Sequence, residues 1–233
     1  MNSSRLLRAV AGLALVGSLT GCGVISVGAG STATPTTSAT GNTTGGASVT
    51  SSTTSSTSSS SSASGTADAQ ALLGEMVPYP AGARPWAQSK TGAFGLSDFI
   101  NNFYVPDARA QETPSVQRRG FTGAARHGWF TADGSQDEVW LVDFATDTGA
   151  QSMLLELSNS WKEETSSGAG YQDPGVNGMG MTNPTLDAQG NAWAKEAARV
   201  GRTLVYVITF APATPDKAAA EALIKQQVGR VSG

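Results

Sequence analysis

The chain of 233 residues contains a single cysteine and a single histidine. One cysteine cannot form an intramolecular disulfide, and one histidine cannot supply a Cys/His zinc site. The sequence also lacks an uninterrupted apolar run of the roughly 20 residues that a transmembrane helix needs. We therefore expect no disulfide framework, no metal ion, no cofactor and no spanning helix.

The first 21 residues have the three zones of a secretory signal peptide. Arg5 and Arg8 form a positive n-region, residues 9–16 form an apolar h-region, and small residues follow up to Cys22. The apolar zone is about half the length of a membrane-spanning helix. This pattern predicts that residues 1–21 direct export of the chain and are then removed.

The stretch L-T-G-C, formed by Leu19, Thr20, Gly21 and Cys22, resembles the lipobox of bacterial lipoproteins. In that family the thiol is joined to diacylglycerol, the peptide is cut just before the cysteine, and the new amino terminus becomes open to acylation. Two or three acyl chains anchor firmly, whereas a single chain binds a membrane only marginally. The resemblance implies that a lipidated Cys22 holds the mature protein on a membrane surface. The alternative is an ordinary secretory cleavage site with a free thiol.

A Ser/Thr-rich segment follows Cys22. Residues 31–66 contain 25 serines or threonines in 36 positions, with no charged and no aromatic residue. Such a segment cannot bury enough apolar area to offset its chain entropy. The composition predicts a disordered tether over residues 22–66, and it is also typical of O-glycosylated stalks.

Residues 67–233 are long enough for one domain with its own core. This part of the chain contains all 18 acidic residues but only 13 of the 15 basic ones, so its net charge is −5. The basic residues are scattered, with Arg118-Arg119 as the only adjacent pair. A mildly acidic domain without a basic patch is expected to bind neither nucleic acid nor anionic lipid through its surface.

Apolar periodicity predicts an order of helices and strands in this domain. The expected helices cover 67–76, with Thr66 as N-cap, 95–104, 148–162 and 214–228, and the expected strands cover 120–131, 138–145, 191–200 and 203–210. Hairpins followed by helices favour the α+β class, with an antiparallel sheet and helices packed mainly on one face. The strands 138–145 and 203–210 are apolar on both faces, so either they are central or the N-terminal helices or a ligand cover the second face.

The C-terminal third repeats the hairpin-helix pattern of the middle third. Aligning residues 139–157 with 205–223 without a gap gives five identities in nineteen positions and pairs Trp140 with Tyr206. Apolar and capping positions coincide as well. The pattern therefore makes the two β-hairpin–helix units candidates for an internal duplication.

The whole layout resembles a group of secreted lipoproteins of high-GC Gram-positive bacteria. Beyond the lipobox and the tether, the resemblance rests on the proline-rich stretch 77–83 and on the R-G-F…A-A…W pattern of residues 119–129. It implies a small α+β domain held by a lipid anchor on the outer face of the cell membrane. It assigns no activity.

Candidate catalytic groups are few. His127 is the only base available for a Ser-His-Asp triad, and it lies in an expected strand without a G-x-S-x-G motif. Asp137-Glu138 would point to opposite faces of a strand and Glu163-Glu164 ends an expected helix, so both pairs are interpreted as surface carboxylates. The glycine-rich residues 175–181 lack the ending of a phosphate-binding loop and are expected to form a flexible loop that leads into an edge strand.

The aromatic residues are the candidates for ligand contact. Five tryptophans are many for a domain of this size, and Trp129, Trp140, Trp193 and Tyr206 are the residues expected to face a ligand. The sequence predicts a non-catalytic interaction module that contacts another exported protein or a cell-wall component. The alternative is a carrier of a small amphiphile, a lipid or a sugar, in a pocket between sheet and helices. A hydrolase that uses His127 or a carboxylate pair is the third interpretation.

Overall fold

The computed structural model describes residues 61–164 and 168–233, and the side chains of residues 67–162 and 168–233. The predicted signal peptide, the lipobox with Cys22 and most of the tether lie outside the described residues. The elements in chain order are α1 (Ser61–Glu75), β1 (Arg84–Pro85), the 3₁₀ helix η1 (Gln88–Lys90), β2 (Gly92–Phe94), α2 (Leu96–Phe103), α3 (Pro106–Arg118), β3 (Phe121–Phe130), β4 (Gln136–Phe144), α4 (Asp147–Glu164), β5 (Ala169–Asp173), β6 (Gly178–Asn183), β7 (Asn191–Val200), β8 (Thr203–Pro212) and α5 (Lys217–Val231).

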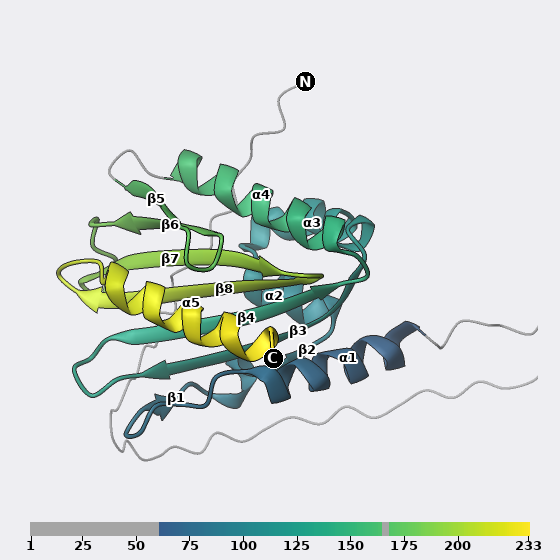
Figure 1. The fold of residues 1–233 in the computed structure, drawn as a ribbon, viewed down its shortest axis with the longest axis horizontal. Coiled ribbons are helices and arrows are strands. Elements are labelled where there is room, and N and C mark those ends of the chain that lie inside the picture. The colour runs from purple at the N-terminus through teal and green to yellow at the C-terminus, as the bar shows by residue number, and fades with distance from the viewer. Residues whose placement is uncertain (1–60, 165–167) are drawn as a thin grey trace, which may run out of the picture. The chain divides into compact units, whose positions relative to one another are not determined.

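Eight strands form one sheet in the order β1-β3-β4-β8-β7-β6-β5, with β2 paired to β3 beside β1 (Figure 1). Every strand pair is antiparallel. The long strands β4 and β8 lie at the centre, where Trp140 is directly opposite Tyr206. The predicted α+β class and antiparallel sheet are therefore confirmed.

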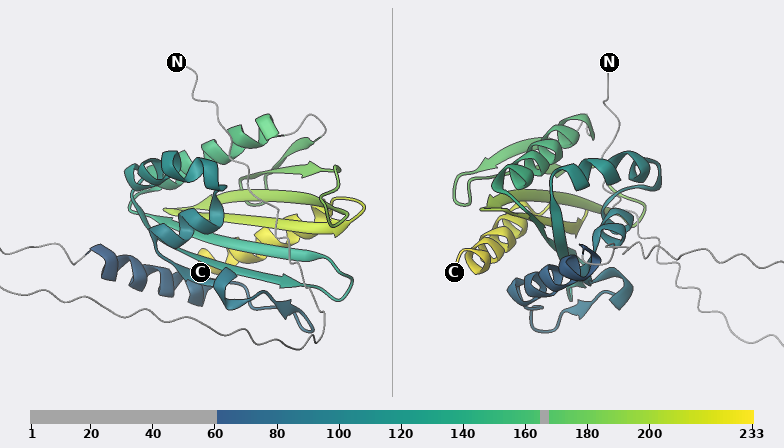
Figure 2. Two further views of the ribbon diagram at one scale, coloured as in Figure 1. Left: turned by 180° about the vertical axis from the view of Figure 1, so that it is seen from behind. Right: turned by 90° about the vertical axis from the view of Figure 1, so that its right-hand side faces the viewer.

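Helices cover both faces of the sheet, which differs from the expected packing mainly on one face (Figures 1 and 2). On the α4 face, Trp140, Phe144 and Tyr206 pack under α2, α3 and α4. On the α5 face, Leu141 and Val207 pack under α1 and α5. Because side chains alternate along a strand, a central strand with apolar residues at every position must be covered twice. The N-terminal helix α1 supplies part of the second cover, as one of the predicted alternatives stated.

The predicted helices and strands are present, but several bounds differ, since α5 covers Lys217–Val231 instead of 214–228, and β1, β2 and β5 have no counterpart among the predictions. Helix α1 begins at Ser61, so Thr66 lies inside the helix and is not its N-cap. Helix α3 has no counterpart among the predictions, because it is mostly polar and contains Pro114. Residues 175–177 form the turn that leads into β6, but residues 178–181 already belong to β6, and β6 is not an edge strand because it lies between β5 and β7.

The two hairpin-helix units differ in where their helices pack. Trp140 and Tyr206, the aligned positions of the two hairpins, lie on the same face of the sheet. Helix α4 covers that face through residues such as Leu157, whereas α5 covers the opposite face through residues such as Ile224. A rotation that superposes the hairpins therefore does not superpose the helices, and the duplication stays a prediction.

Candidate functional site

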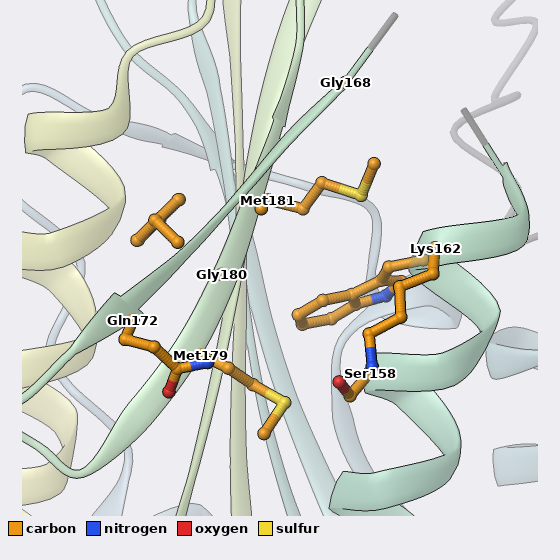
Figure 3. A pocket seen from close by; sticks show the side chains of 10 residues that line it. Ser158, Lys162, Gly168, Gln172, Met179, Gly180 and Met181 are labelled. Carbon is orange, nitrogen blue, oxygen red and sulfur yellow. The ribbon is translucent and has the colours of Figure 1, made fainter. Parts of the chain in front are cut away.

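A groove lies between the C-terminal half of α4 and the strands β5 and β6, on the α4 face (Figure 3). Its volume is about 510 Å³. Its lining residues are Ser158, Trp161 and Lys162 from α4, Gly168, Gly170, Tyr171 and Gln172 from β5 and the residue before it, and Met179, Gly180 and Met181 from β6. A volume of this size is within the range of small-molecule and side-chain sites, which is roughly 300 to 1,000 Å³.

The groove exists because small residues stand where the sheet passes the end of the helix. Gly170 is directly opposite Met181, and Gln172 is opposite Met179, so all four positions share the α4 face. Gly170 contributes no side chain, and the nearest atom to a Cβ built there is the Gly180 carbonyl oxygen, 3.9 Å away. The space beside Gly170 is therefore open.

The interior of the groove is apolar, and its rim is polar. Met179 and Met181 point from β6 toward α4, where Ser158 and Lys162 lie across the gap (Figure 3). Methionine side chains are unbranched and polarizable, so they adapt to differently shaped apolar groups. This arrangement suits an apolar group that enters between the two methionines while neutral or charged polar groups stay at the rim.

Trp161 closes the inner end of the groove. It is 3% exposed and stacks on Tyr206 with 5.9 Å between ring centroids. Its Nε1–H is buried and has no acceptor among the described residues. The groove is therefore continuous with the aromatic core through Trp161, and it ends at a wall of packed rings.

On the opposite face of the sheet, Tyr171 of β5 lies directly above Gly180 of β6. A Cβ at Gly180 would lie 2.2 Å from Tyr171 Cζ, so only glycine allows the ring to cross β6 here. The ring reaches β7, where its hydroxyl donates to Glu196 Oε2 at 3.2 Å. Glu196 is fully buried. This contact fixes β5 across β6 to β7.

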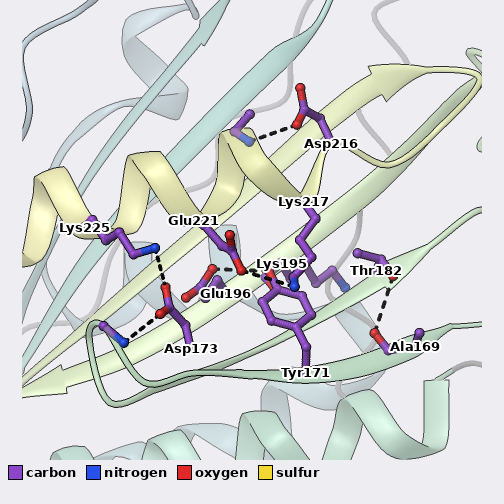
Figure 4. Close-up of polar contacts among 12 residues, drawn as sticks. Ala169, Tyr171, Asp173, Thr182, Lys195, Glu196, Asp216, Lys217, Glu221 and Lys225 are labelled. Carbon is purple, nitrogen blue, oxygen red and sulfur yellow. Dashed lines mark hydrogen bonds and ion pairs between the residues drawn. The ribbon is translucent and has the colours of Figure 1, made fainter.

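Two carboxyl groups, those of Asp173 and Glu196, lie beside Tyr171 (Figure 4), and their pKa values are shifted in opposite directions. Burial, and then the charge of Asp173, raises the pKa of Glu196 to about 7. Burial alone would raise the pKa of Asp173 as well, but the Gly175 amide and the Lys225 ammonium outweigh it and hold that pKa below its usual value. Asp173 Oδ1 accepts from Gly175 N at 2.8 Å, and Asp173 Oδ2 is 3.2 Å from Lys225 Nζ. Glu196 therefore takes up a proton as the pH falls through about 7, whereas Asp173 stays charged.

The four residues expected to face a ligand all lie in the packed core, where none lines the groove. Trp140, Trp193 and Tyr206 share the α4 face, and Trp129 lies on the α5 face. Each is at most 6% exposed. Tyr206 contacts one lining residue of the groove, Trp161. Their contact with a ligand stays a prediction.

The candidate catalytic groups are engaged in structural contacts. His127 Nδ1 is 2.9 Å from the Val77 carbonyl oxygen, and its ring stacks on Tyr79 with 4.4 Å between centroids. Burial lowers the pKa of His127, so the ring is neutral at pH 7. Glu138 forms a buried ion pair with Arg126 on the α4 face, and burial raises the pKa of Asp137, on the other face, to about 6. The side chains of Glu163-Glu164 lie outside the described residues.

Two further observations concern metal and membrane. Within residues 61–164 and 168–233, no group of three or more His, Cys, Asp and Glu side chains could hold a metal ion. In the same part of the chain, no helix combines the length and apolarity needed to cross a bilayer.

A second cavity, of about 370 Å³, lies where α1 and the end of α5 meet the β7–β8 turn. Its central acid is Asp143, which is 2.8 Å from Arg202 Nη2 and accepts hydrogen bonds from Thr122 and Thr203. The Asp143 carboxylate is therefore satisfied from within the fold.

Sequence reasoning missed the groove because it missed the strands that form it. The M-G-M alternation of Met179, Gly180 and Met181 was the available signal, since apolar residues at every second position indicate a strand face. The glycines around it favour a loop instead. The position of α4 above these strands could not be derived from the sequence.

No family model matches the chain, and no curated protein is significantly similar to it. Among solved structures, the fold is similar to the extracellular domain of PknH from Mycobacterium tuberculosis, with a TM-score of 0.46 and 13% sequence identity. The similarity covers 71% of this chain and 90% of that one. A similarity of this size carries no argument about function.

Proposed function

We propose that the chain is an extracytoplasmic lipoprotein whose folded domain is a non-catalytic interaction module, and that the groove between α4 and β5–β6 is its binding site. The observation that carries the proposal is the groove itself, with a volume of about 510 Å³, an apolar interior and a polar rim. Sites with these properties usually bind a small ligand or an anchoring side chain. The partner is an exported protein or a cell-wall component, and nucleic acid is not one.

The sequence supports the location. The signal peptide, the lipobox at Cys22 and the Ser/Thr-rich tether over residues 22–66 together suit a domain held at a distance from the membrane. Cys22→Ser removes the acylation site, so the chain is expected to stay unprocessed or to be released from the membrane fraction. Mass spectrometry of the mature amino terminus tests this directly, and a free thiol at Cys22 would contradict the anchor.

The contacts of the titratable residues support binding rather than catalysis. His127 uses its Nδ1 atom on a backbone carbonyl and lies on the α5 face, whereas the groove opens on the α4 face. Glu138 is neutralised by Arg126. The carboxyl groups of Asp173 and Glu196 are buried under α5 and line neither described cavity. None of these four side chains lines the groove.

The amphiphile carrier remains the second candidate, and one observation favours it. Met179, Met181 and Trp161 give the groove an apolar interior beside the sheet, which a carrier also requires. Native mass spectrometry with lipid extraction separates the two functions. A stoichiometric amphiphile that co-purifies with the full chain would make the carrier the better account.

A photo-crosslinking residue in the groove tests the interaction module. Gln172 is exposed at the groove, and Gln189, which is also exposed, is a control in the loop before β7. With the full chain in its own envelope, we expect a discrete adduct from position 172 and none from position 189. The adduct should disappear in Gly170→Leu, which fills the groove, and persist in Gly229→Leu, where a Cβ meets nothing within 4 Å. Absence of any adduct from position 172 would contradict the proposal.

A further inference from the structure

Strand β5 is the last strand at its end of the sheet. It pairs with β6 from Ala169 to Asp173, and no strand among the described residues lies beyond it. One row of its backbone N–H and C=O groups therefore faces outward without a strand partner in that part of the chain. An edge of this kind is a template for pairing with another extended chain.

This edge lacks the features that usually protect one. Natural edge strands are protected by lysine, proline, a bulge or a covering segment. The sequence of β5, A-G-Y-Q-D, contains no lysine or proline, and its register with β6 is continuous. Its one charged residue, Asp173, is only 4% exposed, because it is held inward by Lys225 and the Gly175 amide. Nothing on β5 itself opposes an added strand.

The groove begins directly beside this edge. Gly170 and Gln172 lie on the α4 face of β5, and Gly170 is exposed and leaves open space. A strand added along β5 lies about 4.8 Å away, and every second side chain points to the α4 face. A large side chain beside Gly170 would therefore enter the groove toward Met179 and Met181.

We propose that β5 and the groove together bind an extended segment of an exported protein, which adds a strand to the sheet and places one large apolar side chain in the groove. This inference rests on the proposed function and adds the kind of partner that the site takes. Main-chain hydrogen bonds give such complexes their affinity, and the pocket for alternate side chains gives them specificity.

The composition of β5 favours a different chain over a second copy of this one. In a symmetric pair of β5 strands, the partner would present only Gly170 and Gln172 to the α4 face, and neither fills an apolar groove. Residues 31–66 of the tether have the same shortcoming, because Val49 is their only aliphatic residue larger than alanine. A small amphiphile would fill the groove but leave the backbone of β5 unpaired.

The test is a selection of random ten-residue peptides, displayed on their mRNA, against the full chain in detergent. Enriched peptides should combine strand-forming residues with one large apolar residue. Each is then resynthesised with one backbone amide methylated at a time. We expect a period-two pattern, in which amides that face β5 lose at least tenfold in affinity and the intervening amides lose little. Gly170→Leu should abolish binding, and Gly229→Leu should leave it unchanged.

Each other outcome overturns the inference in a recognisable way. Peptides that are sensitive to Gly170→Leu but show no period-two pattern would retain the groove as a binding site and exclude strand addition. If no peptide is enriched, but position 172 gives a discrete adduct or an amphiphile co-purifies, the groove would likewise be retained as a binding site and strand addition would be excluded. A full chain that is dimeric and becomes monomeric in Gly170→Leu would make a second copy the occupant. Absence of peptide, adduct and amphiphile alike would overturn both the inference and the proposed function.

Discussion

The two ends of the sheet differ in the strands that form their edges. At one end, β1 and β2 pair with the outer edge of β3, and Trp86 N donates to the Gly128 carbonyl oxygen at 2.8 Å. At the other end, β5 has no strand beyond it in the described part of the chain and borders an apolar groove. The outer edge of β3 is covered by two very short strands of two and three residues, whereas the five-residue strand β5 ends the sheet beside the groove, and this difference indicates where a partner chain should be sought. We infer that β5 is kept accessible for binding, and the experiments below separate the two edges.

The largest expected effect comes from the buried ion pair at the covered edge. Arg126 Nη2 is 2.8 Å from Glu138 Oε1, and its guanidinium lies 4.8 Å from the ring centroids of both Trp86 and Trp140. Glu138→Ala leaves a buried guanidinium without its counter-ion, so the free energy of unfolding should fall by about 3 to 5 kcal/mol. Urea denaturation measures the change.

The control for Glu138→Ala is a pair near solvent. Glu221→Ala removes the partner of Lys217, at 3.2 Å in the same helix, and should cost less than about 1 kcal/mol. If Glu138→Ala costs no more than this control, Arg126 reaches water in the variant, and the covered edge does not depend on the pair.

The second test compares a glycine-to-alanine substitution at each of the two edges, at Gly128 of β3 and at Gly170 of β5. A Cβ at Gly128 would lie 2.3 Å from Trp86 Cε3, whereas a Cβ at Gly170 meets nothing nearer than 3.9 Å. Gly128→Ala must displace the indole, and overpacking of this kind costs about 1 to 3 kcal/mol. Gly170→Ala should change the free energy of unfolding by less than about 0.5 kcal/mol. Urea denaturation of both variants compares the edges, and equal losses would remove the distinction between them.

The smallest expected effect is the pH dependence that Glu196 contributes at the accessible edge. Its pKa is raised to about 7 in the folded protein, so its contribution to stability is full at pH 4 and is lost as the pH rises through 7. Glu196→Gln keeps an uncharged side chain beside Tyr171 and should remove this decline. Between pH 5 and 8 the variant should therefore gain stability relative to the wild type by at least about 1 kcal/mol.

Urea midpoints at pH 5 and pH 8 check the effect of Glu196→Gln. Asp137, whose pKa is about 6, titrates in the same window, but it is present in both proteins and cancels in the comparison. The lowered pKa of Asp173 acts only in acid, below this window. If the stability of the wild type and of the variant changed in parallel with pH, ionisation of Glu196 would cost the folded state little free energy.

Much of the central fold could be predicted from the sequence, because its periodicities are strong. Leu96, Phe99, Ile100 and Phe103 predicted α2, and the alternation around Trp140 predicted β4. Helix α3 was missed because it buries only Ala108, Glu112 and Val116 and carries a proline. Its proline at the first position is nevertheless a recognised helix start.

The candidate site could not be predicted, because its features are tertiary. Strand β5 has no strong alternation, and Gly170 has meaning only once Met181 is opposite to it. Which strand ends the sheet depends on strand order, which propensity does not encode. The pairing of Tyr171 with Glu196 likewise depends on Gly180 standing between them.

The most direct test of the account is amide hydrogen exchange of the full chain, measured with and without a saturating peptide from the selection. The account predicts that amides of β5, residues 169–173, become at least tenfold better protected, while amides 124–130 of β3 at the covered edge do not change. Protection confined to the groove residues of α4 and β6, with β5 unchanged, would contradict the claim that this edge pairs with a partner strand.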